Sequence, residues 1–171
     1  MWDISAVRST HAGARKMGVV MGEQELFNGL IATYRELNLK VRTLPEERLS
    51  LGQAGNTVRD VVLEMRDDEL RFSQALKDRL SGVSLTGAFG DRGETQLIEI
   101  PSPDDTTVEV ISQFGTARES TLAMLRGMAP ETWDDRDHGP ATVREATEDL
   151  LASDGVHLEK IVTLLGSPSA N

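Results

Sequence analysis

The chain has 171 residues, a formal net charge of −10 at pH 7 and no cysteine. Its length suits one domain. On folding, a domain of this size buries roughly 70% of the surface that the unfolded chain exposes, so its core needs no disulfide or structural metal for stability. The absence of cysteine excludes a disulfide framework, a thiolate nucleophile and a cysteine-ligated zinc site. The negative net charge opposes binding to nucleic acid and to anionic membranes.

The first 21 residues mix small and polar side chains without a sustained period, which predicts a flexible N-terminal arm over 1–21. This start lacks the apolar core of a secretory signal, and no stretch approaches the roughly 18 apolar residues of a membrane span. Together with the absence of cysteine, these features predict a soluble cytoplasmic protein with no membrane partner.

Two amphipathic helices are predicted in the first half of the chain. The first runs from about 23 to 43 and is closed by Pro45, and the second begins at Thr57, with Asp60 as the acid of a capping box, and is ended by Gly82. Their apolar positions recur at spacings of three and four. These positions are Leu26, Leu30, Ile31, Leu37, Val41 and Leu44 in the first helix, and Val58, Val61, Val62, Met65, Phe72, Leu76 and Leu80 in the second.

Residues 82–104 are rich in Gly, Pro, Asp and Ser around one short alternating run, "QLIEI", which predicts a long crossover with room for an extended segment. A third helix is predicted from about Thr106 to a stop at Pro130, and a fourth begins at the capping box "TVRE", at Thr142. Trp133, in the linker between them, is expected to anchor that linker over one end of the helices. The inward positions are Val108, Ile111, Phe114, Leu122, Leu125 and Met128 in the third helix, and Val143, Ala146, Leu150, His157, Ile161 and Leu164 in the fourth.

Two segments match when one is shifted by 85 residues without a gap, which places "PE" at 45–46 on "PE" at 130–131 and "TVRD" at 57–60 on "TVRE" at 142–145. This favours an internal duplication into two helical hairpins around a pseudo-twofold axis. The alternative is that helix stop and start signals recur wherever helices occur. Because a single hairpin cannot hide its apolar face, two of them predict an all-α fold, a four-helix bundle.

Polar residues on the apolar stripes are the candidates for a site, because bundles build their sites from inward-facing side chains. The second helix offers Glu64 and Asp68, one turn apart on the same side, and the fourth offers Ser153, Asp154 and His157. Acids facing a serine and a histidine at matching spacing supply oxygen ligands and an imidazole for a divalent ion.

Structural roles for the same residues stay open beside metal binding. Acidic pairs at helical spacing are also typical of a solvated helix face in a chain with 28 acidic residues. Ser153 suits helix packing, and His157 suits a hydrogen-bonded core or pocket histidine.

The stretches "NTVRDVVLEM" and "GPATVREATEDLLASDGVHLEKI", with the proline–acid stops, resemble the DinB/YfiT-like superfamily over about residues 23–165. The resemblance implies a four-helix bundle over 22–166, often dimeric, followed by a short tail over 167–171. Many members hold Ni, Zn or another divalent metal with three histidines. Those positions fall here on Glu64, Ser153 and His157, so the triad is degenerate, with Asp68 and Asp154 as candidate auxiliary ligands.

Two functions follow as hypotheses. The first is a DinB-like module that has lost the three-histidine metal site and binds a small molecule in the bundle or another protein, as a homodimer. The second is a divalent-metal-dependent enzyme, of the thiol-transferase or hydrolase type that the resemblance implies, with a remodelled centre around Glu64 and His157. The second requires Glu64, Asp68 and His157 to converge within about 5 Å around a pocket.

Overall fold

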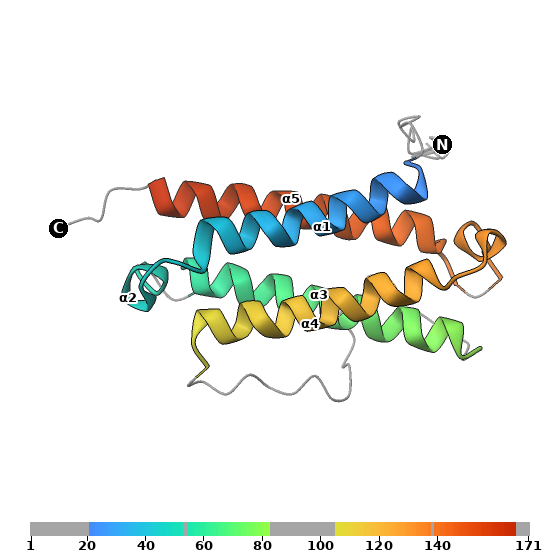
Figure 1. Cartoon of the computed structure of the whole chain (residues 1–171), viewed down its shortest axis with the longest axis horizontal. Coiled ribbons are helices and arrows are strands. Elements are labelled where there is room, and N and C mark those ends of the chain that lie inside the picture. The colour runs from blue at the N-terminus through green and yellow to red at the C-terminus, as the bar shows by residue number, and fades with distance from the viewer. Residues whose placement is uncertain (1–20, 53–54, 83–104, 138, 167–171) are drawn as a thin grey trace, which may run out of the picture.

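The computed structural model describes residues 21–52, 55–82, 105–137 and 139–166. Over these ranges the chain is all-helical, which confirms the predicted class (Figure 1). The elements are α1 (Glu23–Val41), α2 (Glu46–Leu49), α3 (Val58–Leu80), α4 (Thr107–Arg126), the 3-10 helix η1 (Pro130–Trp133) and α5 (Val143–Gly166). Residues 1–20 of the arm predicted over 1–21, the run "QLIEI" and the tail over 167–171 lie outside the described residues. No helix in the described part of the chain is both long and apolar enough to cross a bilayer.

Side-chain caps fix where three of the long helices begin. Thr57 accepts a hydrogen bond from the Asp60 amide, and the Asp60 carboxylate accepts one from the Thr57 amide, so the predicted capping box is confirmed. The same reciprocal pair joins Thr142 to Glu145 at the start of α5. A third box, Thr106 with Glu109, opens α4 and was not predicted. Each cap contributes about 1 kcal/mol by satisfying amides that have no partner within the helix.

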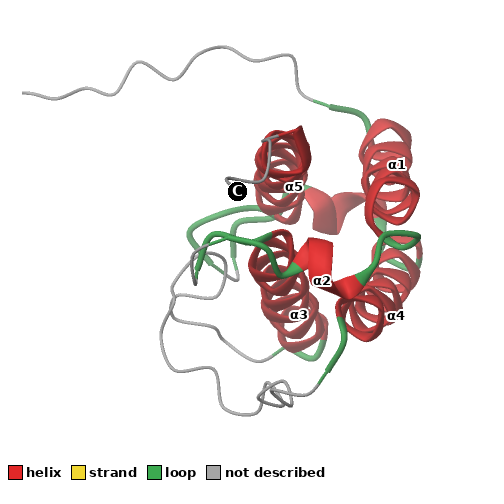
Figure 2. Cartoon of the chain, turned by 90° about the vertical axis from the view of Figure 1, so that its left-hand side faces the viewer, coloured by secondary structure: helices red, strands yellow, loops and turns green. Residues whose placement is uncertain are grey.

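The four long helices lie side by side, with α1 and α5 running one way and α3 and α4 running the other (Figure 1). In the end view the neighbouring pairs are α1–α5, α1–α4, α3–α4 and α3–α5 (Figure 2). The two helices of each predicted hairpin, α1 with α3 and α4 with α5, therefore lie across a diagonal from each other, which differs from the predicted pair of hairpins. The physical reason is the length of the connections 42–57 and 127–142, each of which holds a short helix and can cross an end of the assembly.

The core consists of two apolar clusters, one toward each end of the long helices. The first cluster comprises Leu37, Val41, Leu49, Val58, Val61, Val62, Met65, Val110, Ile111, Phe114, Leu158 and Ile161. The second comprises Leu26, Leu30, Phe72, Leu76, Leu122, Leu125, Met128, Trp133, Val143, Ala146 and Leu150. Between the clusters, polar side chains take the buried positions of all four long helices.

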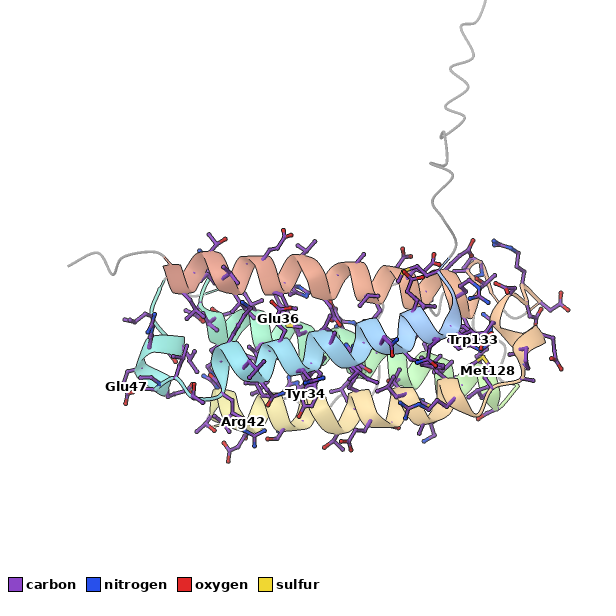
Figure 3. The ribbon with its side chains drawn as sticks, turned by 45° about the horizontal axis from the view of Figure 1, so that its top comes forward. Tyr34, Glu36, Arg42, Glu47, Met128 and Trp133 are labelled. Carbon is purple, nitrogen blue, oxygen red and sulfur yellow. The ribbon has the colours of Figure 1, made fainter. Side chains whose placement is uncertain are left out.

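Trp133 closes the second cluster at the η1 end, beside Met128 (Figure 3). Its side chain is 0% exposed, and its ring meets the edge of Phe27 with 5.8 Å between centroids. The guanidinium of Arg144 lies 5.5 Å from the centre of the same ring. The predicted anchor is therefore confirmed.

Some predicted inward positions are wrong. Leu80 is 44% exposed, since α3 ends at that residue and none of the described helices covers its side chain. Val108 is only half-buried, and Val110 takes the buried place on α4. Leu164 is half-buried too, but it packs against the first cluster as predicted. On α5 the buried stripe passes through Asp154 and Leu158, which turns His157 to the edge of the helix interface.

A shift of 85 residues relates the two halves in structure as it does in sequence. It carries the bounds of α1 onto 108–126 and those of α3 onto 143–165, each within one residue of α4 and α5. It also relates Asp68 to Ser153, whose side chains contact each other.

Candidate functional site

Glu64 and His157 face each other across the α3–α5 interface. The distance from Glu64 Oε2 to His157 Nε2 is 3.6 Å, and Lys160 Nζ lies 3.8 Å from the same oxygen. The side chain of Glu64 is 51% exposed and that of His157 only 14% exposed. The predicted convergence of these two residues is therefore present, with a lysine beside them.

Asp68 lies one turn further along α3 and has two partners. Its Oδ1 forms an ion pair with Arg71, and its Oδ2 accepts a hydrogen bond of 3.4 Å from Ser153 Oγ. Both charged side chains are about one-third exposed. We use the term α3–α5 polar strip for Glu64, Asp68, Ser153, His157 and Lys160.

Asp154 points into the interior instead, although it follows Ser153 in sequence. Its side chain is 2% exposed. Oδ2 accepts hydrogen bonds from Arg118 at 2.8 Å and from Thr33 at 2.9 Å. Asp154 was predicted as an auxiliary metal ligand, but in the structure its contacts are to α4 and α1.

Arg118 and Glu69, which the sequence analysis did not single out, complete this interior cluster. Arg118 Nη2 lies 2.7 Å from Glu69 Oε2, and Nη1 donates to the Leu30 carbonyl oxygen at 3.2 Å. Thr121 donates a hydrogen bond of 2.5 Å to Glu69 Oε1. We call the set Thr33, Glu69, Arg118, Thr121 and Asp154 the central polar layer.

The electrostatics of the central polar layer are unbalanced, since two carboxylates share one guanidinium. Burial raises the pKa of Glu69 above its usual range, while Arg118 and the Thr121 hydroxyl act in the opposite direction and Asp154 adds to the rise. Glu69 Oε2 lies within ion-pair distance of Arg118 but outside hydrogen-bond geometry, and Arg118 Nε is buried without a partner.

The imidazole nitrogen of His157 that does not face Glu64, Nδ1, is buried. Nδ1 has no hydrogen-bond partner in the structure, while Nε2 faces Glu64. A buried imidazole nitrogen usually donates or accepts one hydrogen bond, so Nδ1 has capacity for a further group.

The α3–α5 polar strip does not fit the three-histidine metal centre that the resemblance implies. Two of the three positions carry Glu64 and Ser153, and the ammonium group of Lys160 stands beside the carboxylate that would coordinate. Within the described ranges, no group of three or more His, Asp or Glu side chains is arranged to hold an ion.

An open hollow at the η1 end is lined by Glu131, Thr132, Asp134 and Asp135. Asp134 is held by Arg144 through two hydrogen bonds of 2.8 and 3.0 Å, which lower the pKa of the carboxyl below its usual range. These contacts fasten the linker to the start of α5, which is a structural role.

No protein-family model, curated protein or solved structure matches the chain. The resemblance to the DinB/YfiT-like superfamily stays a prediction that rests on the motifs at 56–65 and 139–161. The functional argument therefore depends on the two polar clusters.

Proposed function

We propose that the protein is a DinB-like, cytoplasmic small-molecule-binding module whose ancestral metal position has become the α3–α5 polar strip. The fold that accompanies this proposal is a four-helix bundle made of two duplicated halves. The equal offset of 85 between both pairs of long helices supports the duplication. The resemblance also supports a homodimer, which sedimentation at micromolar concentration tests, and a monomer there would contradict it.

One observation carries the functional proposal: each acid of the predicted ligand set already has a basic partner. Lys160 stands beside Glu64, Arg71 beside Asp68 and Arg118 beside Asp154. A divalent ion would have to displace an ammonium or guanidinium group at each position, and its oxygen ligands would have to come within about 2.0–2.6 Å. The chain's own cations therefore take the place that a metal has in the family.

The same pairing suggests what the strip binds. Carboxylates and basic groups lie side by side there, each at least 32% exposed, along one interface between two helices. A small zwitterionic molecule can exchange its own charges with these pairs. We therefore propose small zwitterions as the ligand class.

Metal analysis tests the first half of the proposal. The purified full chain is incubated with Zn²⁺, Ni²⁺ or Mn²⁺, desalted and analysed for bound metal, beside a His157→Ala variant and a Glu159→Gln control on the exposed face of α5. We expect metal well below one ion per chain in all three proteins. A content near one per chain that disappears only in His157→Ala would refute the proposal.

Saturation-transfer NMR with free L-amino acids as probes tests the second half. We expect transfer from the wild-type protein and its loss in Asp68→Asn and Lys160→Met, with Glu159→Gln unchanged. No transfer at millimolar probe, or equal transfer in all four proteins, would contradict a zwitterion site in the strip.

The metal-dependent enzyme is the second candidate, favoured by the approach of Glu64 Oε2 to His157 Nε2 at 3.6 Å with Asp68 one turn away. Its chemistry would be that of a thiol transferase or hydrolase. Stoichiometric metal in the first experiment is the result that would establish it over the binding module.

A further inference from the structure

The central polar layer crosses the whole interior at the boundary between the two apolar clusters. Each long helix contributes to it: α1 through Thr33, α3 through Glu69, α4 through Arg118 and Thr121, and α5 through Asp154. The side chains of Glu69, Arg118 and Asp154 are each at most 2% exposed. Because all four long helices meet at this layer, any change in the charge of the layer acts on the packing of all four.

The carboxylates of Glu69 and Asp154 differ in the hydrogen bonds that they accept. Asp154 accepts hydrogen bonds from both Arg118 and Thr33. Glu69 receives one bond, from Thr121, and its other oxygen only approaches Arg118. The charged groups that face Glu69 are Arg118 of α4 and Asp154 of α5, while α1 supplies the uncharged Thr33 and the Leu30 carbonyl. One guanidinium thus neutralises one carboxylate, and Asp154 is the better bonded of the two.

We propose that Glu69 is protonated in the folded protein and that its ionisation loosens the packing of the four helices, so that the central polar layer acts as a pH-sensitive device. With the proton in place, the layer holds one cation, one anion and one neutral acid, which is the balanced state for a dry interior. Loss of the proton leaves a second anion beside Asp154, with no further cation within the layer.

The sign of the pH dependence follows from the raised pKa of Glu69, which burial causes. A raised folded-state pKa gives a stability contribution that is complete below the unfolded value of 4.5 and is lost as pH rises through the folded value. Between these two values the folded state holds one more proton than the unfolded state. The unfolding equilibrium constant therefore increases about tenfold for each unit of pH in that window.

Urea unfolding of the full chain from pH 4.5 to 9 tests this inference with wild type, Glu69→Gln and a Glu64→Gln control. Gln copies the shape of the protonated acid, so we expect Glu69→Gln to match wild type at the acid end and to exceed it increasingly at higher pH, by about tenfold per unit. Glu64→Gln should follow wild type. Parallel curves for wild type and Glu69→Gln would overturn the proposal.

A direct measurement on the wild-type chain covers the case in which Glu69→Gln fails to fold. With ¹³C-labelled glutamate carboxyls, we expect one resonance of the native protein to titrate well above the others. If all the glutamate carboxyls titrate together in their ordinary range, Glu69 is ionised at neutral pH and the proposal is wrong.

Discussion

Replacing Arg118 by methionine is the sharpest test of how the interior is held together. Methionine fills a similar volume but leaves Asp154 and Glu69 without their guanidinium. Removing one partner of a buried ion pair costs about 3–5 kcal/mol, because the remaining charge stays buried and uncompensated. Loss of the bond to the Leu30 carbonyl oxygen adds about 1 kcal/mol. Since domains of this kind are stable by about 5–15 kcal/mol, Arg118→Met removes a large part of the total.

Urea unfolding followed by circular dichroism at pH 7 gives the free energy of unfolding for this comparison. Arg71→Met is the matched control, because Arg71 is 35% exposed and its pair with Asp68 is worth only about 0–1 kcal/mol. A deficit below about 1 kcal/mol at pH 7, comparable to that of Arg71→Met, would refute the picture of a charge-compensated interior.

Three smaller perturbations follow from local geometry. Gly155→Ala should stabilise the protein by about 0.5–1 kcal/mol, because Gly155 is helical and an added Cβ meets open space, and thermal unfolding measures the gain. Gly115→Ala should destabilise it, since the new Cβ would lie 2.6 Å from Cζ of Tyr34, which reaches from α1 toward α4 (Figure 3), and an unchanged melting temperature would be inconsistent with that contact. Thr142→Ala should cost about 1 kcal/mol by removing the acceptor for the Glu145 amide, and the loss should be absent when Thr116, exposed in the middle of α4, is replaced instead.

Local signals predicted the helices well. Thr57 and Thr142 stand where capping boxes predict, and Gly82 has the positive φ of +72° that a residue just past a helix favours. These local signals do not predict which helices become neighbours, because a connection as long as 42–57 can reach either a neighbouring or a diagonal position. Packing of the apolar faces against the other half of the chain decides between them.

The site was harder to predict because neighbouring residues compete for the same buried place. The spacing predicts Asp68 on the apolar stripe of α3, yet Glu69 is the buried acid. Asp68 lies at the edge of the helix interface, beside Ser153. Spacing alone cannot separate residues that differ by one position, and the partner that decides, Arg118, lies on another helix. The shift of 85 residues holds a usable signal, since it superimposes Glu69 on Asp154 and Thr33 on Arg118.

The diagonal placement of α1 and α3, and of α4 and α5, has a consequence for how the protein folds. Because α1 and α3 lie across a diagonal, as do α4 and α5, each long helix packs mainly against helices of the other half of the chain. Neither half can act as an independent folding unit, so unfolding should be a single cooperative step. A chain with one half alone could gain a core only by interlocking with a second copy, as the two halves interlock within this molecule.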